Sequence, residues 1–246
     1  MIASAWAGGG FVLGAIAGSF LATLAVRWPT GRSVTSGRSA CDGCGRTLTV
    51  WELLPLVSAL LQRGRCRGCG AAIAPDHAAI EWGAAAIGGA AFGLMPGVAG
   101  AGWALFGWLL LTLAALDARH FWLPDRLTLT LGALGLLGGG LTTGISLADR
   151  AIGVVAGFAA LWAIGRGYRW LRGREGLGGG DAKLLGAIGA WLGWQALPFV
   201  VLAASILGLL AAAFAGGLRS DRAVPFGTAL AAGTLPGWIA LRLLGG

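Results

Sequence analysis

Long apolar runs separated by short polar segments fill most of the chain. A helix needs about 20 apolar residues to cross a bilayer. The runs predict eight membrane-spanning helices, near residues 4–26, 78–96, 98–116, 127–145, 151–170, 182–195, 197–217 and 224–244. The sixth run is short, and Pro198 separates it from the seventh, so a partial span or a re-entrant segment is an alternative there. Because the apolar positions are continuous rather than alternating, the predicted fold class is an all-α integral membrane protein and not a β-barrel.

Composition supports this fold class. The chain has 246 residues, of which 57% are hydrophobic and 11% are charged, whereas soluble domains contain roughly 25% charged residues. Its 46 glycines suit membrane helices, in which small residues let backbones approach closely. Phe11–Val26 is followed by no cleavage signal, so we expect it to be retained as a helix.

The basic residues are distributed unevenly between alternate loops. Of the 18 lysines and arginines, 16 lie in segments 27–77, 117–126, 166–183 and 218–223, and only Arg150 and Arg242 lie on the other side. The positive-inside rule makes the basic side cytoplasmic, with both termini facing outward. The net charge of +8 then reflects loop arginines, and we expect no nucleic-acid partner.

A small polar segment between the first two helices holds all four cysteines. Cys41–Cys44 and Cys66–Cys69 form two CxxC motifs with 21 residues between them. This spacing predicts a structural zinc site with four thiolate ligands in a zinc-ribbon-like loop. A reducing cytoplasm argues against disulfides, and metal-free thiols or a redox pair remain alternatives. The predicted parts are therefore a first helix (1–26), a cytoplasmic four-cysteine loop domain (27–77) and a transmembrane helical domain (78–246).

Asp117 and Asp181 each adjoin a membrane-length apolar run. A carboxylate at that depth is costly and is usually functional. The topology places both at the cytoplasmic ends of their helices, so they are expected to form an aspartyl-protease dyad in which one carboxyl is ionised and the other is protonated. Alternatively, Asp117 merely ends a helix and Asp181 merely caps one. Asp125 follows Pro124 and suits a helix N-cap.

The segment before Asp181 is rich in glycine. Four of the five residues Gly176–Gly180 are glycines, more than a helix cap requires, and they would let an extended substrate approach the backbone. A nucleotide-binding loop is excluded, because neither the GxGxxG spacing nor a GKS/GKT ending is present. A proton-coupled transporter and a membrane assembly subunit with a zinc loop are the competing functions. Carriers often place carboxylates near the bilayer midplane between inverted repeats, and we find no such repeat.

These motifs, in this order, resemble the type IV prepilin peptidases, which belong to the GxGD intramembrane aspartyl proteases. The resemblance covers nearly the whole chain. It is carried by Gly18–Leu21, Arg27–Pro29, the two CxxC motifs with Arg63–Cys66, Glu81, Asp117 with Leu123–Asp125, Gly178–Leu185 and Pro225–Gly227. The chain departs from the family at Asp42–Gly43 and Thr47–Trp51, and it has Ala22 where the family usually has Asn.

The resemblance implies an endopeptidase that cleaves the basic leader of prepilins or type II secretion pseudopilins at the cytoplasmic face of the bacterial inner membrane. It implies that Asp117 and Asp181 are catalytic and that Gly178, Gly180 and Lys183 bind substrate. Lys183 is the only lysine in the chain, and a membrane-anchoring role is its alternative. Relatives with the cysteine loop often also methylate the new N-terminus with S-adenosylmethionine.

Overall fold

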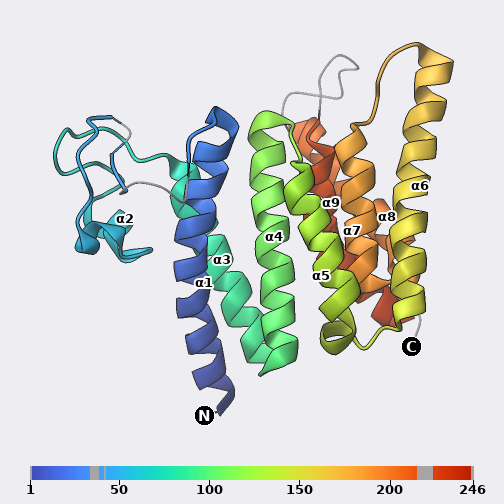
Figure 1. Ribbon diagram of the computed structural model, residues 1–246, viewed down its shortest axis with the longest axis horizontal. Helices are drawn as coiled ribbons and strands as arrows, with labels where there is room; N and C mark the ends of the chain where they lie inside the picture. The colour runs from blue at the N-terminus through green and yellow to red at the C-terminus, as the bar shows by residue number, and fades with distance from the viewer. Residues whose placement is uncertain (1, 34–38, 42, 215–223, 245–246) are drawn as a thin grey trace. The chain divides into compact units, whose positions relative to one another are not determined.

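The computed structural model describes residues 2–33, 39–41, 43–214 and 224–244. Arg38, Asp42, Arg219 and Arg222, which entered the charge and motif arguments, lie outside the described residues. The described helices are α1 (Ile2–Arg27), α2 (Val57–Leu61), α3 (Pro75–Leu94), α4 (Val98–His120), α5 (Asp125–Thr143), α6 (Leu147–Arg172), α7 (Gly179–Leu192), α8 (Leu197–Phe214) and α9 (Phe226–Leu244) (Figure 1). Within the described ranges β-structure is limited to two isolated bridges, Ala40–Thr47 and Arg65–Ala72.

The all-α fold class is confirmed, and eight of the nine described helices correspond to the eight predicted runs. Among the described residues, four segments are long and apolar enough to cross a membrane: Ala3–Thr30, Val98–His120, Leu147–Arg172 and Trp194–Phe214. The main difference from the expected boundaries is at α4, which continues to His120 and ends where Phe121 adopts a φ of 49°. Asp117 therefore lies in the last helical turn and not in the following loop.

The chain forms two compact units, Met1–Ala115 and Leu116–Gly246. In the first unit, α1 and α3 pack closely along their lengths, and glycines make this approach possible. Gly10, Gly14 and Gly18 recur every fourth residue on α1. A Cβ atom at Gly14 would collide with the Ala84 carbonyl oxygen, and one at Gly10 would collide with the Gly88 carbonyl oxygen. This small-residue stripe replaces side-chain packing with backbone contact, as is typical of membrane helix pairs.

The second unit is built around α7, which packs against α5 and α6, while α8 packs against α9. Eleven residues of α7 are buried, namely Asp181, Ala182 and every residue from Leu184 to Leu192. Trp191 donates its Nε1–H to the Leu131 carbonyl at 2.8 Å, and glycines at Gly153 and Gly189 bring α6 and α7 into backbone contact. A helix that is apolar on all sides is stable only when its neighbours cover it, which explains how a 14-residue element becomes the centre of the unit.

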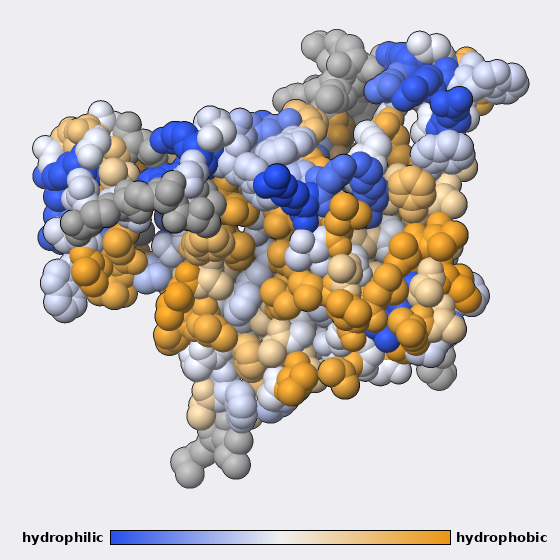
Figure 2. Space-filling view, in the orientation of Figure 1, coloured by the Kyte–Doolittle hydropathy of each residue, from blue (hydrophilic) through white to orange (hydrophobic). Residues whose placement is uncertain are grey.

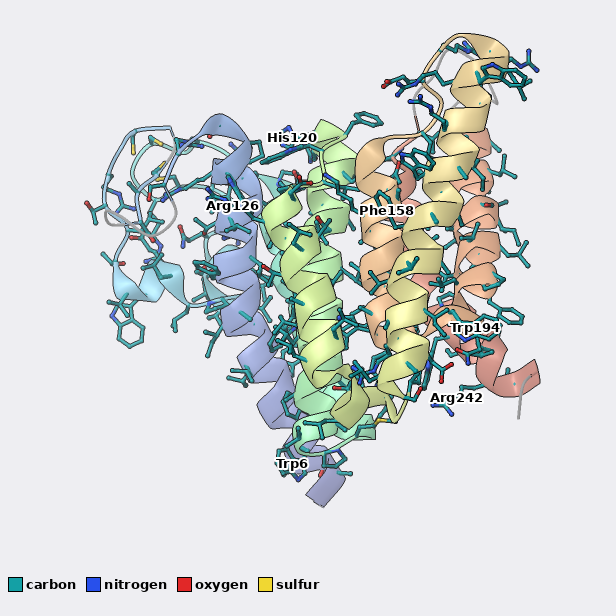
Figure 3. All side chains as sticks on the ribbon, turned by 45° about the vertical axis from the view of Figure 1, so that its right-hand side comes forward. Trp6, His120, Arg126, Phe158, Trp194 and Arg242 are labelled. Atoms are coloured by element: carbon teal, nitrogen blue, oxygen red, sulfur yellow. The ribbon has the colours of Figure 1, made fainter. Side chains whose placement is uncertain are left out.

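The second unit has two distinct ends. Figure 3 shows His120 and Arg126 at one end and Trp194 and Arg242 at the other. Arg150 lies at the same end as Arg242, because its guanidinium donates to the Gly135 carbonyl and Arg242 donates to the Thr143 carbonyl, both in the C-terminal half of α5. Figure 2 shows hydrophilic residues gathered at the C-terminal end of α6 and hydrophobic ones along its middle. The described basic residues of this unit are therefore segregated as the loop charges predicted.

Candidate active site

Asp117 lies in the last turn of α4 and is 5% exposed. Its Oδ2 accepts the Thr228 backbone N–H at 2.6 Å and the Thr228 hydroxyl at 3.1 Å, and the Gly227 N–H also donates to this carboxyl. These donors belong to the first turn of α9, where backbone N–H groups have no partner within the helix. Asp117 therefore caps α9 from another helix, at the end where the helix dipole favours negative charge.

Asp181 lies in the first turn of α7 and is 7% exposed. Its Oδ2 accepts the Gly178 N–H at 3.2 Å, while its own N–H donates to the Gly178 carbonyl at 3.2 Å. The glycine segment thus folds back onto the carboxylate at its end. Among the described residues the Asp181 carboxyl receives one donor, whereas the Asp117 carboxyl receives three, and this asymmetry separates the two acids chemically.

Leu123, between α4 and α5, connects the two aspartates. A Cβ atom at Gly180 would lie 2.9 Å from the Leu123 Cβ, and one at Gly227 would lie 2.8 Å from the Leu123 Cδ1 and 3.0 Å from the Asp117 Cγ. No side chain fits at either glycine without displacing Leu123. Because Gly180 precedes Asp181 and Gly227 contacts Asp117, the Leu123 contacts bring both carboxyls to one site, where the charge of Asp117 acts on Asp181.

The predicted capping role of Asp125 is wrong. Pro124 is the N-cap of α5, no side chain caps this end, and Asp125 is the first residue inside the helix. Its Oδ1 instead accepts a hydrogen bond from the Lys183 Nζ at 2.6 Å, forming an ion pair between α5 and α7. The tertiary contact with Lys183 replaces the local cap.

The remaining predicted site residues have structural contacts of their own. Gly178 is the N-cap of α7, and Gly180 provides the space that Leu123 fills.

Thr228 was not among the predicted site residues. The only signal for it is its position directly after Pro225–Gly227 at the start of an apolar run, where a helix would expose free N–H groups.

The cysteine loop of the first unit forms a separate cluster. The Sγ atoms of Cys41, Cys44, Cys66 and Cys69 all lie within 4.8 Å of one another, and none of the four is in a disulfide. The Gly43 N–H donates to the Cys41 Sγ and the Gly68 N–H to the Cys66 Sγ, each at 3.4 Å. Hydrogen bonds from the backbone of Cys69 and then Gly68 lower the pKa of the Cys66 thiol to about 6. The pKa of Cys69 is raised to about 11, with hydrogen bonding to Cys44 and burial among the causes, so the case for a metal rests on the number and spacing of the four sulfurs, which suit one metal ion.

Sequence comparison adds a family assignment to this geometry. Residues 104–213 match the Type IV leader peptidase family, and residues 12–94 match the Bacterial Peptidase A24 N-terminal domain. A protein of Aeromonas hydrophila called "Prepilin leader peptidase/N-methyltransferase" is 43% identical over 212 residues, which are 83% of this chain and 71% of that protein. The chain belongs to the type IV leader peptidase family.

Other relatives carry the same name. One from Burkholderia pseudomallei is 44% identical over 201 residues, covering 80% of this chain and 65% of its own length. One from Pseudomonas aeruginosa is 40% identical over 209 residues, covering 82% and 70%. The chain thus spans about two thirds of the length of these relatives. No solved structure matches it.

The two matched family regions contain most of the site residues, but not all of them. Asp117 and Asp181 lie within the matched peptidase region, and the four cysteines lie within the matched N-terminal domain. Thr228 lies beyond both regions. Its contact with Asp117 is therefore a property that the three-dimensional structure of this chain adds.

Proposed function

We propose that this protein is a membrane aspartyl endopeptidase that removes the basic leader of type IV prepilins or type II secretion pseudopilins. The observation that carries the proposal is the meeting of two buried carboxyls, Asp117 from α4 and Asp181 from α7, around Leu123. The names of the relatives support the substrate class. Buried acids in a membrane protein are energetically costly, and those that are present usually have a function.

The donor asymmetry supports different chemical roles for the two acids. Hydrogen bonds to an ionised carboxylate favour its charged form, and Asp117 receives the donors of Gly227 and Thr228 at a helix N-terminus. Asp117 is therefore the general base. Asp181, with the single Gly178 donor, carries the shared proton.

The reaction follows from these roles. Asp117 takes a proton from a water molecule while the oxygen of that water attacks the scissile carbonyl carbon. The Asp181 carboxyl donates a hydrogen bond to the carbonyl oxygen. The tetrahedral intermediate then loses its C–N bond, and the departing nitrogen takes the proton that Asp117 had accepted. The exposed backbone of Gly178–Gly180 is the binding surface for the extended leader, which needs no side-chain specificity there.

Location agrees with this substrate. A prepilin carries a basic leader followed by a hydrophobic helix that enters the bilayer, so its scissile bond lies at the membrane surface. Both aspartates lie at the basic end of the second unit, and the positive-inside rule makes that end cytoplasmic. We therefore propose a multi-pass protein of the bacterial inner membrane, with its active site and its cysteine loop on the cytoplasmic side.

Purified protein incubated with a prepilin tests the proposal. We expect Asp117→Asn and Asp181→Asn each to abolish cleavage, while Asp149→Asn, an aspartate at the opposite end of the same unit that bonds Trp194 and Gln195, leaves it intact. Cleavage that survives both dyad substitutions would refute the peptidase. Proton-driven uptake that depends on Asp117 and Asp181 without proteolysis would favour a transporter.

We further propose that the four cysteines hold one structural zinc ion. Four thiolates in reach of one another form a closed tetrahedral site that leaves no position for substrate. A short loop with little core gains folding free energy from such an ion. The cluster therefore stabilises the loop domain rather than taking part in proteolysis.

N-methylation of the new N-terminus is a second candidate activity, supported by the names of the relatives. The first unit contains a cavity of about 340 Å³ lined by Ser19, Arg27, Glu52, His77 and Glu81 among others. The Glu52 and Glu81 carboxylates in its lining are already paired, Glu52 with Arg46 and Glu81 with the Leu56 N–H and His77, so they supply no free charge for a cationic ligand. S-adenosylmethionine, if bound, would supply an electrophilic methyl group. Mass spectrometry of a processed pilin tests this, because methylation adds one CH₂ to the mature N-terminus, and its absence in the presence of the methyl donor would refute it.

A further inference from the structure

One segment of the cysteine loop differs from the rest of that loop. It consists of the 3-10 turn Val50–Leu53, the intervening Leu54–Leu56 and helix α2 (Val57–Leu61). Its hydrophobic side chains Val50, Trp51, Leu53, Leu54, Val57, Leu60 and Leu61 are between 38% and 77% exposed. Figure 2 shows hydrophobic residues gathered over α2 on the visible face. A water-soluble loop of this size would not normally expose so continuous an apolar patch.

Leu56 fixes this segment against the helix pair α1–α3. Its side chain is 7% exposed and clusters with Ala15 of α1, Ala85 of α3 and the partly buried Phe11. Its N–H donates to the buried Glu81 carboxylate at 2.9 Å. Leu56 adopts a φ of 64°, a left-handed conformation that is unfavourable for a leucine and persists only when the surroundings enforce it.

The anchor contacts set the depth of the segment. Ala85 lies ten residues beyond Pro75, the first residue of α3, and Ala15 lies twelve residues before Arg27, the last residue of α1. At 1.5 Å per residue these separations are about 15 and 18 Å along the helix axes. The hydrocarbon core is about 30 Å thick, and α1 belongs to a candidate membrane span. Leu56 therefore contacts both helices about three turns inside the ends that face the cysteine loop.

Backbone and charge in this segment suit lipid. The N–H groups of Glu52, Val57, Ser58 and Leu60 are hydrogen-bonded to carbonyls within the segment or next to it, which lowers the cost of placing this backbone in nonpolar surroundings. The only charged side chain, Glu52, is buried and accepts two hydrogen bonds from Arg46, at 2.5 and 3.2 Å. The apolar surface therefore carries no uncompensated charge.

The flanking residues have the opposite character. Arg63, Arg65 and Arg67 follow Leu61 directly and are exposed, which is typical of residues that lie among anionic headgroups. At the depth of Ala15, α1 itself exposes the apolar side chains Val12, Leu13 and Ile16. The segment thus continues an apolar surface of the same unit.

We propose that residues 50–61 form a re-entrant element that dips from the cysteine loop into the bilayer beside α1 and α3, with lipid acyl chains as its partner. The element ties the metal-binding loop to the membrane surface. It is independent of the proposed peptidase activity.

The test uses the full-length, metal-loaded protein in phosphatidylcholine–phosphatidylglycerol vesicles that contain a phosphatidylcholine with a diazirine in its acyl chain. After irradiation and digestion, mass spectrometry locates the labelled residues. We expect labelling of residues 50–61 alongside Val12–Phe20 of α1, and none on residues 43–47 of the cysteine loop. Lipid labelling of α1 without labelling of 50–61 overturns the proposal, as does crosslinking of 50–61 to a second copy instead of lipid.

A pair of variants sharpens the result. Leu60→Asn combined with Leu61→Asn replaces two exposed apolar side chains and leaves the Leu56 anchor unchanged. We expect lipid labelling of residues 50–61 to fall to the level of residues 43–47. Thr47→Asn, an exposed change in the same loop, is the matched control and leaves labelling unchanged. Metal content, measured for each variant, verifies that the loop is folded, and undiminished labelling in the folded double variant contradicts insertion of α2.

Discussion

At the scale of single residues, the contact that most affects the proposed chemistry is the one between Thr228 and Asp117. Thr228→Val removes the hydroxyl that lies 3.1 Å from the Asp117 Oδ2 and keeps the backbone donor at 2.6 Å. A hydrogen bond to a charged group contributes about 1.5–3 kcal/mol, and the lower value corresponds to roughly a tenfold loss of kcat. We expect such a loss with little change in KM, measured on a prepilin peptide.

Thr228→Ser is the matched control for this prediction, because serine retains both donors. A positioning role predicts that serine keeps most of the activity, whereas valine does not. Equal activity of the valine and serine variants would show that the hydroxyl has no part in orienting Asp117.

At the scale of helices, glycine contacts determine which pairs can approach. Gly14 of α1 faces the Ala84 backbone of α3, whereas Gly9, on the same helix, has nothing within 4 Å of an added Cβ atom. Overpacking costs about 1–3 kcal/mol, so we expect Gly14→Ala to lower the thermal unfolding temperature in detergent by several degrees. Gly9→Ala should leave it unchanged or slightly higher, because alanine favours helix. Equal effects of the two substitutions would contradict backbone packing of α1 on α3.

The ion pair between Asp125 of α5 and Lys183 of α7 is also a helix-scale feature. Its side chains are 59% and 40% exposed, and exposed pairs contribute about 0–1 kcal/mol to stability. If Lys183 only joins the two helices, exchanging the charges with Asp125→Lys and Lys183→Asp should restore whatever activity Lys183→Gln loses. If Lys183 binds the leader, KM rises in Lys183→Gln and stays high in the exchanged protein. Cleavage kinetics of the three proteins distinguish these roles.

At the scale of the whole molecule, the two compact units should respond differently to loss of metal. Elemental analysis should find about one zinc ion per chain, because four thiolates complete one tetrahedral site. A strong chelator should make the loop around Cys41–Cys69 sensitive to protease while the second unit, which holds no cysteine, stays resistant. Cys44→Ser should reproduce the effect without chelator. A loop that stays resistant after complete metal removal would contradict a structural role for the ion.

The extent of prediction varied with the range of the interaction. The helices followed from the apolar runs, since length and hydropathy are properties of contiguous residues. The end of α4 and the role of Asp125 were predicted wrongly, because Phe121 and Lys183 act through turn geometry and tertiary contact. The partnership of Thr228 with Asp117 spans 111 positions, and no local pattern encodes such a pairing.

The sequence by itself determined that this is an all-helical membrane protein with a cysteine cluster and two acids at helix ends, because burial of apolar runs and the cost of a charge in lipid depend on residue type and order. Only the tertiary structure decided that Leu123 packs between the segments that carry the two acids and that α9 supplies the donors for Asp117. It also decided that Leu56 packs part of a polar loop against α1 and α3. Those contacts depend on the space left by particular glycines and on helix ends far apart in the chain, which are fixed when the helices pack.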